Sequence, residues 1–414
     1  MLEELFQKAL HIEKPFYVKG LNFDEDAKRL DIEIDFERGA LFRYKDEASG
    51  QEGEYKAYDT EKKSWRHLNF FEHECYLSCR VPRVKLEDGS VRQVSPSWEG
   101  ESLGFTLLFE ALLLQMCQKM PVRTVGEMVS VSDDKLWRML EKYVGIALSR
   151  ADHSKITAIG MDETSRQRGH DYITLFVDLN ERKTIHVAEG KGSETVKSFV
   201  EDFKAHKGEP ESIKDVSCDM SPAFIKGIKD NLKEAQITFD RFHVLKIINE
   251  AVDDIRKAEV KNNPLLKGTK YLFLKNEENL TVDQKSELDE LKLSKLNFQS
   301  LKALSIREAF QDIYEAKSVK KFELLLKKWH WWASHCRLEP MQKAARTIKA
   351  HWDGIVNWKR SLINNGLLEG LNSLIQAAKA KARGFRTFRN FRIIVFLVTG
   401  KLNFKEINPA YAPI

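Results

Sequence analysis

The sequence predicts a multidomain α+β protein. This prediction rests on three successive patterns in the spacing of hydrophobic residues along the 414-residue chain. Apolar and polar residues alternate between residues 16 and 94, which is typical of half-buried strands. Segments of strand and helix character then follow one another between residues 151 and 245. From residue 246 to 363 the spacing is helical. We therefore expect a β-rich module, an α/β core and an all-helical insertion.

Composition and length exclude several classes of protein. With 42% apolar and 31% charged residues, the chain is neither disordered nor collagen-like, and its length allows several buried cores. The longest apolar run, residues 393–399, is far shorter than the ~20 residues that cross a bilayer. The first residues lack a secretory signal, and the five cysteines are scattered. We expect a cytoplasmic protein without disulfides or a membrane span.

Residues 1–101 are predicted to form the β-rich N-terminal module. Residues 30–36 and 76–81 alternate between apolar and polar side chains, so both segments are expected to be strands. Segment 46–63 is polar and contains glycine, which favours a loop.

Residues 102–150 are predicted to form a helix-turn-helix. The inward face of its first helix is expected to carry Phe105, Leu108, Leu112 and Met116. After a short second helix, Ser132 is a favourable N-cap for a third. This helix would present Lys135, Trp137 and Arg138 to a DNA major groove. A plain helical hairpin has the same pattern and is the alternative.

Residues 151–245 are predicted to form the first part of a catalytic α/β core. Strands are expected at 155–161, 172–177, 183–187, 213–218 and 235–239, with helices after the third and fourth. Three antiparallel strands followed by helix, strand, helix and strand is the order of an RNase-H-like sheet. In that sheet the first and fourth strands are neighbours.

Three carboxylates are the candidate catalytic residues. Asp162 follows the first expected strand and Asp219 the fourth, so their like charges would repel unless a cation lay between them. The third candidate is Glu369, on a helix whose polar stripe includes Asn372 and whose apolar stripe includes Leu374. Oxygen ligands favour Mg²⁺ or Mn²⁺, and two such ions would support phosphoryl chemistry. A strand-end aspartate that caps a turn is the alternative.

Basic residues near the end of the chain indicate a phosphate-binding surface. Residues 377–392 contain no acidic residue and six basic ones: Lys379, Lys381, Arg383, Arg386, Arg389 and Arg392. A solvated helix face is the alternative. Arg166 and Arg168, just after the first carboxylate, would lie beside the scissile phosphate, or in an ordinary solvated loop.

The all-helical insertion, residues 246–363, contains most of the tryptophans. They are Trp329, Trp331, Trp332, Trp352 and Trp358. Tryptophans at near-helical spacing favour core packing, and stacking on DNA bases is the alternative.

Four motifs resemble those of DDE transposases of the ISL-three type, which bacterial insertion sequences encode. The motifs are Asp162-Glu163, Cys-Asp-Met-Ser-Pro at 218–222, Asp-Arg-Phe-His-Val at 240–244 and Asn-Gly-Leu-Leu-Glu-Gly-Leu-Asn at 365–372. Segments 65–71 and 271–281 are also similar to that family, and the resemblance extends from about residue 60 to 404.

The resemblance implies a catalytic triad of Asp162, Asp219 and Glu369. It implies cleavage at the terminal inverted repeats of the element and transfer of the freed 3′ hydroxyls to target DNA. The expected partners are two DNA ends held by a dimer or larger assembly, in association with the bacterial nucleoid. Residues 364–404 would complete the core, followed by a tail at 405–414.

Two further features come from this resemblance. Asp240 and His243 belong to a family motif, so they and Asn372 are candidates for supporting the site; a helix-capping aspartate and a packed histidine are the alternatives. Family members usually carry a zinc ribbon near the N-terminus. Here the candidates His67, His73, Cys75 and Cys79 lack a CxxC pair, so we expect apolar packing in place of zinc.

Two other functions remain open at this point. An RNase-H-like nuclease would need the three carboxylates but neither the helix-turn-helix nor the insertion. A catalytically silent DNA-binding protein derived from a transposase would not need the carboxylates, and all three are present.

Overall fold

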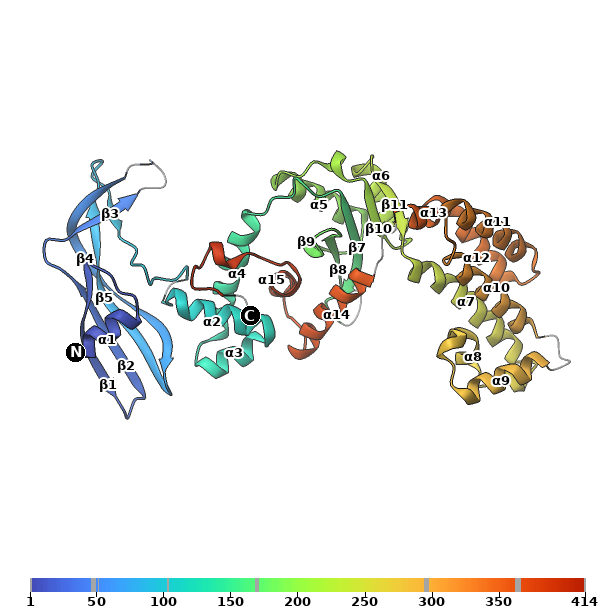
Figure 1. Ribbon diagram of the computed structural model, residues 1–414, viewed down its shortest axis with the longest axis horizontal. Helices are drawn as coiled ribbons and strands as arrows, with labels where there is room; N and C mark the ends of the chain where they lie inside the picture. Colours follow the sequence, from blue (N-terminus) through green and yellow to red (C-terminus); the bar gives the residue numbers. More distant parts are fainter. Residues whose placement is uncertain are drawn as a thin grey trace. The chain divides into compact units, whose positions relative to one another are not determined.

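The computed structural model describes residues 2–45, 50, 52–102, 104–167, 171–293, 298–361 and 366–412. Contacts divide the chain into two compact units: a first unit of Met1–Ala151 with Ala377–Ile414, and a second unit of Asp152–Gln376. Each unit contains one mixed β-sheet and several helices, so the predicted α+β class is confirmed (Figure 1). No helix within the described residues is long and apolar enough to span a membrane.

The sheet of the first unit is built from residues 16–93. After helix α1 (Leu2–Ala9), its strands are β1 (Phe16–Asp24), β2 (Arg29–Phe36), β3 (Leu41–Lys45), β4 (Glu52–Phe70), β5 (His73–Lys85) and β6 (Val91–Gln93). The order is β1-β2-β5-β4-β3, with β6 paired to β5 and only the β2–β5 pair parallel among the named strands. Its core includes Ile32, Trp65 and Val81.

The predicted loop at 46–63 is wrong from Glu52 onward, where β4 runs. Every second side chain near the start of β4 is exposed, which explains its polar composition. The strand forms because its backbone pairs first with β3, over residues 52–56, and then with β5, over residues 57–70.

After the sheet, the first unit continues with helices α2 (Leu107–Lys119), α3 (Val122–Val129) and α4 (Asp133–Ser149), and it also contains α15 (Phe388–Thr399). Between α3 and α4, Ser130 has a left-handed backbone with φ 56°. A Cβ on Gly126 would lie 2.6 Å from the carbonyl oxygen of Val131, so this tight turn requires glycine. Leu108 and Leu112 are exposed, contrary to prediction, because α2 buries the face with Phe109 and its neighbours.

The second unit contains a five-stranded sheet in the order β11-β10-β7-β8-β9. The strands are β7 (Ala158–Ser165), β8 (Tyr172–Asp178), β9 (Lys183–Glu189), β10 (Asp215–Cys218) and β11 (Gln236–Phe239). Strands β7, β8 and β9 are antiparallel neighbours, whereas β10 runs parallel to both β7 and β11. Helices α5 (Ser193–Ala205) and α6 (Pro222–Asn231) pack against each other. All five predicted strands are present, with shifted ends.

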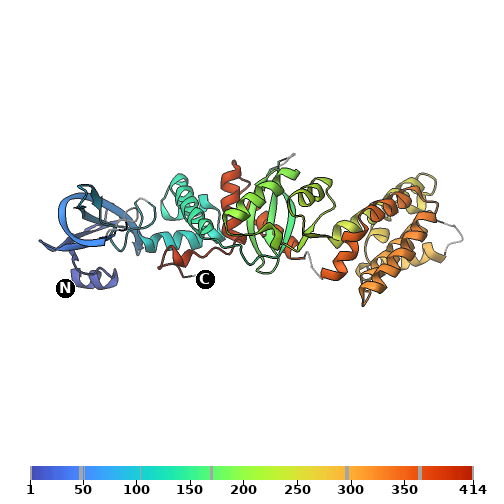
Figure 2. The same ribbon diagram turned by 90° about the horizontal axis from the view of Figure 1, so that it is seen from above.

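The remaining helices of the second unit form a bundle, which both views of the ribbon display (Figures 1 and 2). They are α7 (Arg241–Val260), α8 (Lys270–Leu274), α9 (Val282–Leu293), α10 (Gln299–Ile313), α11 (Val319–His335), α12 (Glu339–Ala350) and α13 (Trp352–Ser361). Single-turn 3-10 helices occur at Pro210–Ser212, Pro264–Leu266, Glu277–Asn279 and Phe404–Glu406. Arg307 is buried inside the bundle and donates to the carbonyl oxygens of Leu274 and Lys275.

Helix α13 covers the outer edge of β11. The Nδ2 atom of Asn357 donates to the carbonyl oxygen of Ile237 at 3.4 Å and to Thr238 Oγ1 at 2.8 Å. Gly354 allows this close approach, because a Cβ there would lie 2.4 Å from the ring of Phe239. The helical bundle is therefore joined to the sheet through its last strand.

Helix α14 (Gly366–Lys381) contains the boundary between the two units. The sequence analysis assigned residues 364–404 to the final helices of the core, but residues from Ala377 onward cluster with the first unit. The physical reason is aromatic packing: Phe385 contacts Trp137 of α4, and α15 lies against α2 and α4.

Candidate active site

Three aspartates lie side by side at one edge of the sheet in the second unit. Ser217 of β10 pairs with Gly160 of β7, and Cys218 pairs with Phe239 of β11. When both parallel pairings are extended past these residues in the same register, Asp219 lies opposite Asp162 on one side and Asp240 on the other. The three aspartates therefore lie at the same level on neighbouring strands. Asp162 lies inside β7, opposite Leu175 of β8, and not at the strand end that the sequence predicts.

A pocket of about 510 Å³ opens over these aspartates. The described residues that line it are Met161, Asp162, Glu163, Asp219, Asp240, Phe242, His243, Leu368, Glu369 and Asn372. The structure thus brings together all three predicted catalytic residues and all three predicted supporting residues. Glu163 is an acidic residue that the sequence analysis did not select, although it stands next to Asp162 in the first motif.

Each aspartate is oriented by its own local backbone. Oδ1 of Asp162 accepts from the N–H of Glu163 at 2.8 Å, and Oδ1 of Asp219 accepts from the N–H of Ser221 at 2.9 Å. Asp240 caps α7 by accepting from the N–H of Phe242 at 2.9 Å. These bonds hold each carboxylate in one orientation.

The charges in the pocket are predominantly negative. Burial, together with the charges of Asp219 and Asp240, raises the pKa of Asp162 to about 6. Burial and the neighbouring Asp219 also raise the pKa of Glu163. His243 Nδ1 lies 3.2 Å from Asp240 Oδ2, and this interaction raises the pKa of His243 despite the opposing effect of burial. A cation would relieve the repulsion among these carboxylates.

Helix α14 closes the pocket from the other side. Leu368 and Leu371 pack against Val177 of β8, and Leu368 approaches so closely that a Cβ on Gly160 would lie 2.9 Å from it. Glu369, in the first turn of α14, is exposed. Leu374, predicted to face the sheet, is 51% exposed, because the helix presents the neighbouring face to the strands.

Two side chains on α14 make polar contacts with β7. The Nδ2 atom of Asn372 donates to Oδ2 of Asp162, and Nε2 of Gln376 donates to Oγ1 of Thr164 at 2.5 Å. The Oδ1 atom of Asn372 is buried and has no hydrogen-bond partner among the described residues.

The donor atoms fit a hard divalent cation. The pocket offers carboxylate and amide oxygens, which Mg²⁺ and Mn²⁺ prefer. Within the described parts of the chain, no three His, Cys, Asp or Glu side chains converge closely enough to bind a metal ion together. The carboxylates therefore line one pocket, but no three of them among the described residues are close enough to coordinate one ion together.

The candidate DNA-binding residues on the helix-turn-helix and the C-terminal basic segment belong to the first unit. Lys135 and Arg138 are exposed near the start of α4, whereas Trp137 is half-buried. Three arginines from the basic segment are also exposed, and one of them contacts α4: Arg383, Arg386 and Arg389. Arg389 forms an ion pair with Glu141. Two basic groups far apart in sequence therefore belong to one unit.

Of the two candidate arginines that follow β7, the structure describes one. Arg166 is half-buried and its Nη2 lies 2.5 Å from Asp171 Oδ2, so it closes the hairpin between β7 and β8. Arg168 lies outside the described residues.

The histidine and cysteine candidates for zinc lie in the first unit. Cys75 and Cys79 belong to the apolar core of the sheet, where burial raises the pKa of both thiols to about 12. Burial and the adjacent Arg66 lower the pKa of His67 to about 4, and its Nδ1 lies 2.8 Å from Thr106 Oγ1. His73 contacts the ring of Phe23.

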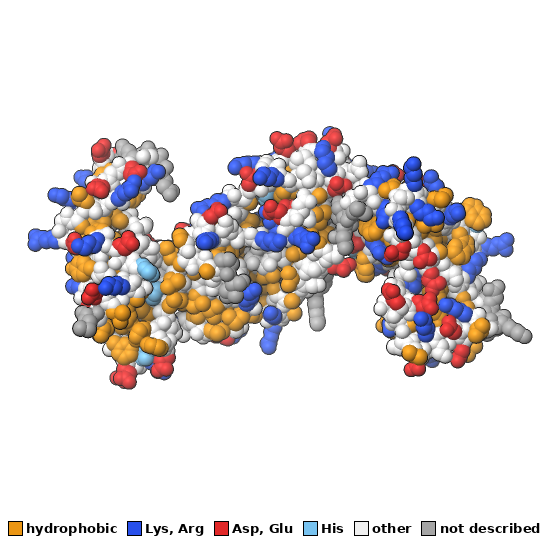
Figure 3. Space-filling view, viewed as in Figure 1, with side chains coloured by type: hydrophobic (Ala, Val, Ile, Leu, Met, Phe, Trp, Pro, Cys, Tyr) orange, Lys and Arg blue, Asp and Glu red, His pale blue; other side chains and the backbone are white. Residues whose placement is uncertain are grey.

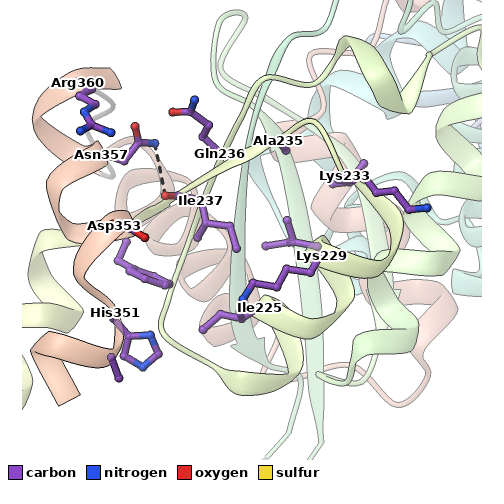
Figure 4. A pocket seen from close by; sticks show the side chains of 15 residues that line it. Ile225, Lys229, Lys233, Ala235, Gln236, Ile237, His351, Asp353, Asn357 and Arg360 are labelled. Atoms are coloured by element: carbon purple, nitrogen blue, oxygen red, sulfur yellow. Dashed lines mark hydrogen bonds between the residues drawn. The ribbon is translucent and has the colours of Figure 1, made fainter. Parts of the chain in front are cut away.

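A second pocket, of about 450 Å³, lies between α6, β11 and α13 (Figure 4). Apolar residues such as Ile225 and Ile237 line it together with Lys229, Lys233 and Arg360. Asp353 is its one acidic side chain among the described lining residues, so it offers no paired carboxylates. The pocket over the three aspartates is therefore the candidate active site.

Comparison with known proteins identifies the family. A family model described as "Transposase" matches residues 159–395, and the helix-turn-helix domain of transposase family ISL3 matches residues 103–144. Since the first match covers more than half of the chain, the protein belongs to the ISL3 transposase family. The resemblance in the sequence and the predicted helix-turn-helix are both confirmed.

Two curated relatives are similar over most of their length. The transposase for insertion sequence element IS1001 from Bordetella parapertussis is 25% identical over 342 residues, which cover 80% of this chain and 83% of the relative. The transposase for insertion sequence element IS1557 from Mycobacterium tuberculosis is 25% identical over 427 residues, covering 92% of each chain.

Proposed function

We propose that this protein is the active transposase of an insertion sequence. It binds the terminal inverted repeats of its element, cuts the DNA at their ends and joins the freed 3′ hydroxyls to target DNA. One observation carries the proposal: Asp162, Asp219 and Glu369 come from three separate elements and line a single pocket. Family membership and the two relatives support it.

The second unit is proposed to be an RNase-H-like catalytic core. Its strand order, with three antiparallel strands followed by two parallel ones, supports this assignment. The helices from α7 to α13 would form the insertion, between the strands that carry Asp162 and Asp219 and the helix that carries Glu369.

Asp162, Asp219 and Glu369 would hold Mg²⁺ or Mn²⁺. Two such ions, when bound, supply activation of an attacking oxygen and stabilisation of a leaving oxygen at phosphorus. The residues of the chain orient the ligands: the N–H groups of Glu163 and Ser221 fix two aspartates, and Asn372 holds Oδ2 of Asp162. His243 partly balances the negative charge through Asp240.

Both chemical steps are in-line displacements without a covalent protein intermediate. In the first, a water oxygen bonds to the phosphorus of the scissile phosphodiester and the 3′ oxygen leaves as a hydroxyl. In the second, that 3′ hydroxyl attacks a phosphodiester of the target DNA and displaces its 3′ oxygen.

DNA binding is assigned to the first unit. Lys135, Trp137 and Arg138 on α4 would enter a major groove, and Arg383, Arg386 and Arg389 would contact phosphates nearby. Their membership in one unit supports a single DNA-end binding surface. Holding two ends at once requires two copies of the chain, so a dimer or larger assembly is proposed.

Cleavage of a DNA fragment carrying the element's own end tests this function. Wild type is expected to nick at the repeat boundary with Mg²⁺ or Mn²⁺, to stop when EDTA is added and to recover when the ion is restored. Asp219→Asn should bind the same DNA with unchanged affinity and lose cleavage by roughly 10⁴-fold. Asp230→Asn, an exposed aspartate on α6, is the matched control and should cut normally.

Two outcomes would overturn the proposal. If wild type binds the end but does not cut in either ion with target DNA present, the protein is a silent DNA-binding relative of a transposase. If it cuts branched or hybrid nucleic acid without preference for the element's end, it is a nuclease.

A further inference from the structure

Helix α11 presents two tryptophans to solvent. Trp329 is buried, as core packing predicts, but Trp331 is 65% exposed and Trp332 is 36% exposed. The interpretation of these two as core residues is therefore wrong. Tryptophan is highly buried on average in folded proteins, and exposed apolar side chains that lie together often mark a binding surface.

The surrounding surface is strongly basic. Residues 318–350 contain eight lysines and arginines against two glutamates, a net charge of +6, whereas the whole chain carries +5. Lys327 and Lys328 are exposed one turn before the tryptophans, and Arg346 and Lys349 are exposed on the neighbouring helix α12. This concentration of positive charge attracts a polyanion.

The opposite end of the same bundle is acidic. Residues 277–290 contain six acidic residues and one lysine. In Figure 3, Lys and Arg side chains are numerous over the upper part of the bundle, where Figure 1 labels α13 and α11, and Asp and Glu side chains gather below them, around the labels α7 and α10. The basic end is therefore a local feature of α11 and α12, not the average character of the bundle.

Trp331 is held as a flat platform. The ring of His335 stacks on it, with centroids 4.9 Å apart and planes inclined by 25°. The Nδ1 atom of His335 lies 2.7 Å from the carbonyl oxygen of Trp331, a hydrogen bond that fixes the histidine in place. Because His335 already covers one face of the Trp331 ring, the exposed part of the ring can stack against one further planar group.

We propose that this surface, which we call the tryptophan face (Lys327, Lys328, Trp331, Trp332 and His335), binds single-stranded DNA. Lysines beside exposed aromatic rings match the alternation of phosphates and bases along a single strand. A duplex fits less well, since its base faces are stacked inside and only its phosphates could be used. The inference rests on the proposed function, because strand cleavage and joining supply DNA with unpaired bases.

The proposal is tested on the full chain with two fluorescent DNAs, a 20-nucleotide oligo(dT) and a duplex of equal length. Fluorescence anisotropy should show that Trp331→Ala weakens binding to oligo(dT) about tenfold and leaves duplex binding unchanged, the size expected for losing one stacked base. Trp331→Phe keeps an aromatic ring and should restore most of the affinity. The joint change of Lys327 and Lys328 to Gln should lower the salt dependence of oligo(dT) binding, with a slope smaller by about 1.4.

Matched controls come from the other end of the bundle. Tyr271 is 58% exposed on α8, so Tyr271→Ala removes an exposed aromatic side chain outside the tryptophan face. Lys285→Gln removes a charge on α9. Both variants should bind oligo(dT) like wild type, and circular dichroism should show that every variant is folded.

Three results would overturn the proposal: Trp331→Ala binds oligo(dT) like wild type, it loses oligo(dT) and duplex binding equally, or it changes only the oligomeric mass in light scattering. The last would identify the surface as a contact between proteins. Asp219→Asn should retain oligo(dT) binding. Failure of the wild-type protein to cut the element's end, with normal single-strand binding, therefore rejects the proposed function but not the tryptophan face.

Discussion

The two sides of the acidic pocket are built in different ways. On the sheet side, Asp162 and Asp219 occupy neighbouring strands, and a backbone N–H fixes each carboxylate. On the helix side, Glu369 is exposed, and its position depends on how Leu368 and Leu371 pack under α14. The sheet thus holds two of the proposed ligands in fixed orientations, whereas the position of the third follows from the packing of the helix.

The largest effect should come from changing side-chain length on each side. Asp219→Glu adds one methylene and breaks the bond from the N–H of Ser221, so we expect a loss of cleavage of about 10⁴-fold. Glu369→Asp shortens an exposed side chain by one methylene and should cost about 10²-fold. Single-turnover cleavage rates at saturating metal measure both. Equal losses would break the contrast between the two sides.

A smaller effect is expected from the hydrogen bond that connects the two sides. Asn372→Ala removes the donor to Asp162 Oδ2 and the unpartnered amide oxygen beside it. Loss of a group that orients a ligand typically reduces affinity for the metal or activity by about 10–100-fold. The ion concentration that gives half-maximal cleavage should rise. Ser373→Ala, at the exposed neighbouring position, should behave like wild type.

The smallest expected effect is a change in the free energy of unfolding, caused by the close packing of α14 on the sheet. Gly160→Ala places a methyl group against Leu368 and Leu179, which should lower the free energy of unfolding by about 1–3 kcal/mol. Gly370→Ala, beside Glu369 with nothing within 4 Å, should instead raise it by about 0.4–1 kcal/mol. Urea titration followed by circular dichroism compares them. Destabilisation by Gly370→Ala would show that α14 is not regular at this point.

The sheet of the second unit was predictable because each strand has a strong local signal. Runs such as 172–177 are predominantly apolar between turn residues, and the order of strands and helices indicates the topology. The expected meeting of Asp162 and Asp219 followed from that topology. The position of Asp162 inside β7 did not, because the strand continues through polar residues whose pairing with β8 no local pattern reveals.

Elements that depend on distant packing were not predictable. Strand β4 is polar through much of its length and exists because two neighbouring strands satisfy its backbone. The assignment of Arg383–Arg389 to the helix-turn-helix unit depends on a contact between Phe385 and Trp137, which are far apart in sequence. Trp329 and Trp331 are two residues apart, yet the first is buried and the second is exposed. The orientation of α11 about its own axis decides which of them is buried, and no local pattern gives that orientation.

The contact between α13 and β11 bears on how this protein avoids aggregation. Without α13, the last strand of the sheet would expose unpaired N–H and C=O groups, and such edges pair with other chains and promote aggregation. The helical bundle therefore shields the edge of the sheet through α13. Any minimal version of this sheet would need a replacement helix over β11 to prevent pairing with other chains through that edge.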